Sequence, residues 1–65
     1  MEILAGILHD TYPDENGKET AYTDHIVGVW KRNVFKCVSV PDFMQFEISK
    51  KDFFAKVTDI QKLWS

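Results

Sequence analysis

Apolar positions alternate with polar or small ones through the middle of the chain, and this pattern predicts a central β-hairpin. The stretch from His25 to Val40 reads as two β-rich runs joined by a short polar turn at Arg32-Asn33. Both runs are filled by β-branched and aromatic residues, as is typical of strands. We expect the rest of the chain to add strands on both sides of this hairpin and a helix over one face.

The segment before this hairpin predicts a further strand and a tight turn. Residues 2–10 form a short apolar run that reads as a strand, and Asn16-Gly17 follows it. This dipeptide is typical of a two-residue type I′ turn, which needs positive φ at both central positions. A two-residue turn predicts a ladder in which apolar residues face one another: Ile3 opposite Trp30, Leu4 opposite Val29, Ala5 opposite Gly28, Gly6 opposite Val27 and Ile7 opposite Ile26.

The next two turns set the remaining strand pairs. A two-residue turn at Arg32-Asn33 predicts three pairs: Trp30 with Phe35, Gly28 with Cys37 and Val27 with Val38. Pro41-Asp42 ends the strand and leads into a fourth, residues 43–48. A two-residue reversal there predicts three more pairs: Lys36 with Glu47, Cys37 with Phe46 and Phe35 with Ile48. A longer loop is the alternative, since Pro-Asp lacks the glycine of a tight hairpin.

The C-terminal segment predicts an amphipathic helix. Ser49 and Asp52 have the spacing of a capping box, and residues 50–64 follow. Apolar side chains recur at helical spacing in this segment: Phe53, Val57, Ile60 and Trp64. Thr58 and Asp59 are poor helix formers, so the main rival is a break there, with residues 59–64 as a fifth strand.

The predicted pairs divide the side chains between two faces of one sheet. The face covered by the helix would hold Ile3, Ala5, Ile7, Ile26, Gly28, Trp30, Phe35, Cys37, Met44, Phe46 and Ile48. The other face is also largely apolar, whereas such a face is usually polar when water covers it. A large apolar patch on a small protein usually marks an interface, for which the candidates are Leu4, Leu8, Val27, Val29, Val38, Val40 and Phe43. A small SH3-like β-barrel, which would bury this face by curling, is the alternative architecture.

Length and composition bound these possibilities. The 65 residues leave room for a single domain, residues 1–65, and the 45% of hydrophobic residues are too many for a disordered tail. The one cysteine excludes an intramolecular disulfide and a zinc site, so we expect stability to come from oligomerisation. A lone cysteine and the absence of a secretory signal or membrane span predict a cytoplasmic protein.

The histidines and acidic residues of the chain do not form a recognisable catalytic or metal site. In the predicted ladder His9 lies opposite Asp24, which favours a cross-strand polar pair over a catalytic base. The loop around Asn16-Gly17 fails as a calcium site, because Tyr12 stands where the first carboxylate should be. We therefore expect no catalytic, cofactor-binding or metal-binding residues, and we find no family signature.

Charge is unevenly distributed along the chain, although the net charge is only −2. Five acids form a candidate docking surface for a basic partner: Asp10, Asp14, Glu15, Glu19 and Asp24. Three cations near the second turn form a candidate nucleic-acid site, Lys31, Arg32 and Lys36. The acids outweigh these three cations, and Trp30 and Phe35 are needed by the core, so this site is the less favoured one.

The sequence as a whole predicts an α+β domain with an antiparallel meander of about four strands and one C-terminal helix. The function it favours is that of a non-catalytic, homodimeric protein-interaction module, such as a small inhibitor or accessory factor. Its partner would be a protein, bound through the apolar second face or the acidic hairpin. Nucleic-acid binding is the alternative.

Overall fold

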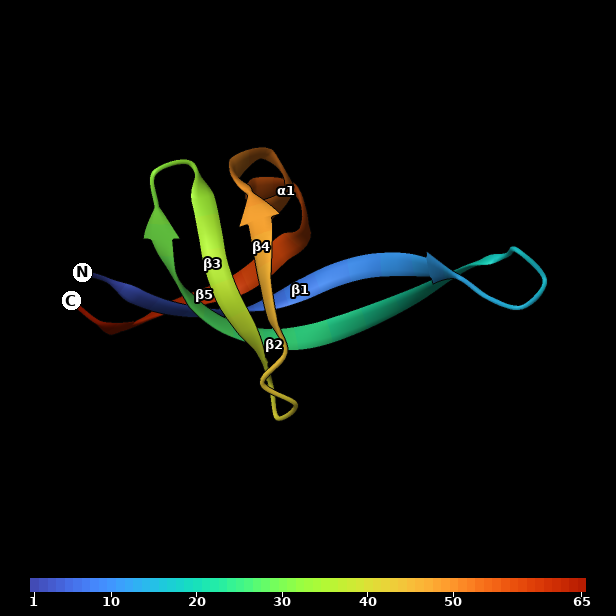
Figure 1. Ribbon diagram of the computed structural model, residues 1–65, viewed down its shortest axis with the longest axis horizontal. Helices are drawn as coiled ribbons and strands as arrows, with labels where there is room; N and C mark the ends of the chain where they lie inside the picture. Colours follow the sequence, from blue (N-terminus) through green and yellow to red (C-terminus); the bar gives the residue numbers. More distant parts are fainter.

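Five strands and one short helix make up the structure (Figure 1), a computed structural model that describes residues 1–65. In chain order the elements are β1 (Ile3–Pro13), β2 (Glu19–Lys31), β3 (Val34–Val40), β4 (Gln45–Ser49), α1 (Lys50–Lys56) and β5 (Val57–Trp64). The strands form one antiparallel sheet in the order β4-β3-β2-β1-β5. The predicted α+β architecture is confirmed. The sheet is not closed into a barrel, because β4 and β5 lie at its two open edges.

The predicted pairing of β2, β3 and β4 is confirmed. Trp30 lies opposite Phe35, and Lys36 lies opposite Glu47. The β3–β4 ladder ends at Val38 and Gln45, so the connection is the longer loop and not a two-residue turn. The hydroxyl and backbone groups of Ser39 hold this loop by bonding Phe43 and Met44. The fourth strand therefore starts two residues later than predicted.

The predicted register between β1 and β2 is wrong by one residue. Asp14 and Lys18 bracket a three-residue loop, and only Gly17 in it has positive φ, +77°. This is the arrangement of a type I turn followed by a left-handed glycine, which adds one residue to a type I′ turn. Ile7 therefore lies opposite His25, and Gly6 opposite Ile26. A one-residue slip exchanges the two faces of a strand, so every side chain of β1 changes face.

The predicted helix over residues 50–64 is wrong beyond Lys56, and the rival fifth strand is the observed structure. Ser49 caps α1 as predicted, its Oγ accepting a hydrogen bond from the backbone N–H of Asp52 at 3.2 Å. Val57 ends the helix in an extended conformation, and β5 then pairs with β1. Without β5, β1 would expose its backbone N–H and C=O groups at an edge. Its pairing is interrupted by two bulges, and Asp59 has φ of +54°.

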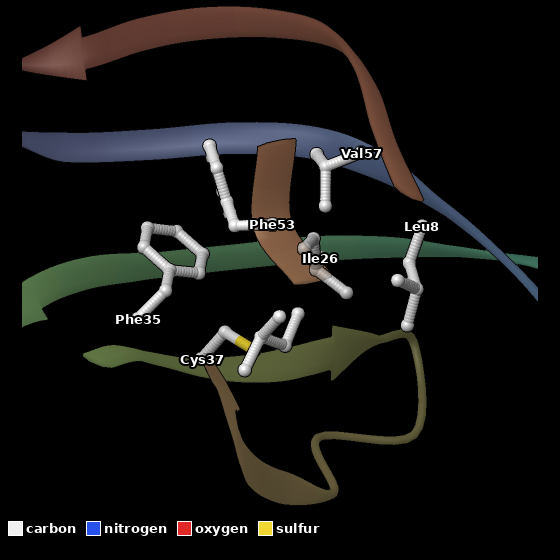
Figure 2. Close-up of a cluster of buried hydrophobic side chains, with 7 residues drawn as sticks. Leu8, Ile26, Phe35, Cys37, Phe53 and Val57 are labelled. Carbon is white, nitrogen blue, oxygen red and sulfur yellow. The ribbon is translucent and has the colours of Figure 1, made fainter. Parts of the chain in front are cut away.

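The core lies between the sheet and α1 (Figure 2). Its buried side chains come from all six elements: Leu8, Ile26, Phe35, Cys37, Ile48, Phe53 and Val57. Phe53 is the contribution of α1, and its ring lies 4.7 Å from that of Phe35, centroid to centroid. We call the face that carries these residues the helix-covered face, and its opposite the second face.

The distal halves of β1 and β2 form an arm that leaves the sheet. β3 pairs with β2 from His25 onward and β5 pairs with β1 only as far as Leu8, so the backbones of residues 9–13 and 19–24 pair only with one another. This arm projects along the long axis of the molecule, away from α1 (Figure 1). Tyr12 and Tyr22 pack on it with ring centroids 5.7 Å apart.

The structure contains no helix with the length and apolar character needed to cross a bilayer. Its one helix, α1, has seven residues.

Candidate functional site

The second face carries an apolar surface that spans four strands. Its members, which we call the second-face patch, are Ile3, Ala5, Ile7, Val27, Val29, Val38, Val40 and Trp64. Most are half-buried by their neighbours in the sheet, while Val40 and Trp64 are exposed. Because α1 packs on the opposite side of the sheet, nothing in the chain covers this patch.

The structure corrects three of the predicted interface residues. Leu8 is a core residue, 6% exposed, and Leu4 packs against the same core, so neither lies on the second face. The reason is the observed β1 register, which places these leucines on the helix-covered face and puts Ile3, Ala5 and Ile7 on the second face instead. Phe43 is exposed in the β3–β4 loop and lies outside the sheet. The four valines, Val27, Val29, Val38 and Val40, lie on the second face as predicted.

The second face is hollowed by two open grooves, both lined in part by Val27. One, of about 570 Å³, runs over β2, β3 and β4, and the other, of about 400 Å³, lies over β1, β2 and β5 and reaches Val40 at the end of β3. The first is bordered by Lys36 and Glu47, whose Nζ and Oε2 atoms lie 3.7 Å apart. Exposed pairs of this kind add at most about 1 kcal/mol to stability. The grooves are thus apolar at their floors and carry both signs of charge at one border.

Gly28 lets β2 and β3 approach one another closely beside this face. A Cβ on Gly28 would lie 2.2 Å from the carbonyl oxygen of Lys36 and 2.7 Å from the Cα of Cys37. No other residue fits there without moving β3. The close approach of β3 to β2 at this point therefore requires glycine.

Two of the five acidic residues of the predicted docking surface make contacts within the fold, and the other three form no ion pair. Asp10 is bound by Lys56, with Nζ and Oδ1 3.3 Å apart. The backbone N–H of Thr11 also donates to Asp10 at 2.8 Å, and these two contacts, the N–H first, lower the pKa of the Asp10 carboxyl. Asp14 holds the hairpin loop through its carboxylate. Glu15, Glu19 and Asp24 form no ion pair.

His9 and Asp24 are not partners, so the predicted cross-strand pair is wrong. In the observed register Asp24 lies opposite Leu8, and His9 lies opposite Thr23 on the other face. Nε2 of His9 instead lies 2.7 Å from Oγ1 of Thr58 on β5. No three His, Cys, Asp or Glu side chains gather into a cluster that could hold a metal ion.

Cys37 lies in the core, as the pairing of β2 and β3 predicts. Its thiol donates to the carbonyl oxygen of Phe46, with an S···O distance of 3.6 Å, and burial raises its pKa to about 11. The thiolate is the reactive form of cysteine, so this residue is a packing element.

The three cations of the nucleic-acid hypothesis do not form one group. Lys36 lies on the second face beside Glu47 of the edge strand β4, whereas Lys31 and Arg32 lie at the β2–β3 turn. The structure instead brings Lys50 and Lys51 to this turn, since the backbone N–H of Lys50 donates to the carbonyl oxygen of Asn33 at 3.1 Å. The helical pattern suggested residue 50 as the start of a helix, and the predicted pair of Phe35 with Ile48, continued by two residues, is the signal that relates this start to the turn.

Comparison with known proteins adds no relative: no family model matches this chain, and neither curated proteins nor solved structures gave a match.

Proposed function

We propose that this chain is a non-catalytic protein-interaction module, and that the second-face patch binds a second copy of the chain. The single observation that carries the proposal is that this sheet face is apolar across four strands while α1 covers only the opposite face. Apolar patches of this kind mark interaction surfaces on small proteins.

The charges at the border of the patch support a second copy as its occupant. A two-fold symmetric contact joins the same surface on both chains, so the surface must be complementary to itself. Lys36 and Glu47 lie side by side at the groove over β2, β3 and β4, and give that border equal numbers of both signs. Each lysine could then meet the glutamate of the other copy without a net charge being buried.

The size of the patch indicates a modest affinity. Four strands at about 4.8 Å spacing and six residues at about 3.3 Å per residue span about 15 by 20 Å. Stable complexes bury about 800 Å² per partner, so we expect a dimer that forms at micromolar and not nanomolar concentration.

Sedimentation velocity from 1 to 200 μM tests the proposal. The native chain should change from monomer to dimer across this range. Val29→Lys with Val38→Lys should remain monomeric at the highest concentration, because a lysine in the patch would have to be desolvated on binding. A matched control, Ala21→Lys with Thr23→Lys, places two lysines on exposed positions of the arm and should still dimerise. A native chain that is monomeric at every concentration contradicts the proposal.

The acidic arm is the second candidate docking surface, for a basic partner protein such as the target of a small inhibitor. Its free acids, Glu15 and Glu19, lie on an arm that projects from the sheet and is open to solvent on both sides. Glu15→Gln with Glu19→Gln separates the two surfaces: dimerisation should be unchanged if the second-face patch carries it. Loss of the dimer in this variant would place the contact on the arm.

A further inference from the structure

The β2–β3 turn and the first turn of α1 lie together at one edge of the molecule. Lys31 is aligned with Val34 and Val34 with Ser49, so the turn and the helix start are separated by two strand spacings, about 10 Å. The hydrogen bond from Lys50 to Asn33 joins them directly. Four exposed cations gather here, Lys31, Arg32, Lys50 and Lys51.

An exposed aromatic ring lies beside these cations. Phe54 is 68% exposed, although its neighbour Phe53 is buried in the core. Lys50 and Lys51 precede Phe54 by four and three residues, so all three lie on one side of α1. The Phe54 ring stacks on Trp30, with centroids 6.2 Å apart and planes inclined by 24°, which holds it in place.

The local charge at this edge is positive even though the whole chain is acidic. Glu2, the residue before β1, is bound by Lys62 on β5, with Nζ and Oε2 2.9 Å apart. Asp52 is the one acid of α1, against four nearby cations. The acidic hairpin tip lies at the far end of the long axis (Figure 1), well beyond the Debye length of about 8 Å at physiological ionic strength.

Arg32 occupies a position where a side chain is disfavoured. Its φ is +60° at the first central position of the two-residue turn, where glycine is the usual residue. Backbone strain of this kind is often found at functional sites. Here it places a guanidinium, the side chain best suited to phosphate, at the tip of the turn.

We propose that this basic–aromatic surface, formed by Lys31, Arg32, Lys50, Lys51 and Phe54, binds single-stranded nucleic acid. The four cations contact backbone phosphates, and the exposed side of Phe54 stacks against one base. A duplex offers no base to Phe54, because its bases are already stacked on one another, and this selects the single strand. The surface is distinct from the second-face patch, so the inference does not depend on dimerisation.

Fluorescence anisotropy with a labelled twelve-nucleotide oligothymidylate tests this inference. Binding should weaken by about 20- to 50-fold between 50 and 200 mM NaCl if three or four phosphates are contacted. Lys50→Gln with Lys51→Gln should lower the slope of log affinity against log salt by about 1.4. The matched control, Lys18→Gln with Lys36→Gln, loses the same charge elsewhere and should bind like the native chain.

The proposed stacking of Phe54 on a base is tested by one variant and a matched control. Phe54→Ala should weaken binding by about fivefold or more, the effect of losing one stacked base. Phe43→Ala removes a phenylalanine of similar exposure, 70%, from the β3–β4 loop and should have no effect. Arg32→Gly should weaken binding while raising the melting temperature, which excludes unfolding as the cause.

Three results would overturn the inference. The first is no binding at 50 mM NaCl. The second is equal affinity for the single strand, a twelve-base-pair duplex and anionic lipid vesicles, which would indicate nonspecific attraction. The third is unchanged oligothymidylate binding by both the Lys50/Lys51 variant and Phe54→Ala, as judged on chains that retain the native circular dichroism spectrum.

Discussion

Asp14 holds Lys18 across the first hairpin loop: its Oδ1 accepts a hydrogen bond from the backbone N–H of Lys18 at 2.9 Å, and a second from that of Asn16 at 2.8 Å. The backbone N–H of Asp14 donates in return to the carbonyl oxygen of Lys18. These bonds fix a loop of three residues. That length sets the register of β1 and decides which of its side chains enter the core.

Replacing Asp14 by alanine should therefore loosen the arm. The two lost carboxylate bonds predict a loss of about 1–2 kcal/mol in the free energy of unfolding, measured by urea titration. Asp14→Asn keeps an acceptor oxygen and should lose less. Glu15→Ala, at an exposed position of the same loop, should change stability by no more than about 0.5 kcal/mol. Equal losses in Asp14→Ala and Glu15→Ala would show that the carboxylate does not organise the loop.

Two adjacent phenylalanines of α1 should differ sharply in their effect on stability. Phe53→Ala removes a buried ring and should cost about 3–5 kcal/mol, a large part of the total stability of a small domain. Phe54→Ala removes an exposed ring that contacts Trp30 and should cost about 1 kcal/mol or less. Thermal unfolding followed by circular dichroism distinguishes them, and similar losses would contradict the observed orientation of α1.

The Asp10–Lys56 pair predicts how acid affects the contact between the arm and α1. The folded-state pKa of Asp10 is lowered, so its contribution is present above the unfolded pKa near 3.8 and is lost as pH falls through the lower folded value. The pKa of Lys56 is raised, so its contribution is lost only as pH rises above 10.5. NMR titration of the Asp10 carboxyl carbon measures the first effect. In Lys56→Met the Asp10 pKa should rise yet stay below 3.8, because the Thr11 N–H remains; a value at or above 3.8 would contradict this.

The raised pKa of the Cys37 thiol predicts that the chain loses stability at alkaline pH. This pKa rises from 9.0 to about 11 in the folded chain, so folding keeps the thiol protonated between these values. The unfolded state releases this proton more readily, and stability should fall as pH rises above 9.0. Cys37→Ala removes this component of the pH dependence. In the native chain, the thiol should react with Ellman's reagent at pH 8 only after denaturation; rapid reaction in the folded state would contradict the burial.

The sequence determined the central hairpin, the pairing of β4 with it and the start of α1. Turn length at Arg32-Asn33, together with the Lys36–Glu47 pair, predicted the registers of β2, β3 and β4, and Ser49 marked the start of α1. These features are local: each depends on residues that are close in the chain.

The register of β1 was decided by the length of the loop that Asp14 holds, and the structure of residues 57–64 was decided by tertiary pairing with β1. Residues 3–8 are apolar or small at every position, so either register buries an apolar face, and only the added loop residue chooses between them. The spacing of the apolar residues Val57 and Ile60 is compatible with the apolar face of a helix and equally with a strand. The strand is formed because it satisfies the backbone groups of β1, a partner about fifty residues away in sequence.

Both candidate surfaces depend on how neighbouring strands pair. The second-face patch gained Ile3, Ala5 and Ile7 only through the β1 register, and the basic–aromatic surface exists because Lys50 meets Asn33 across β3 and β4. Hydrophobic pattern and turn chemistry report which residues a strand can bury. Which surface residues become neighbours depends on how the elements pack, and that was settled only by the folded chain.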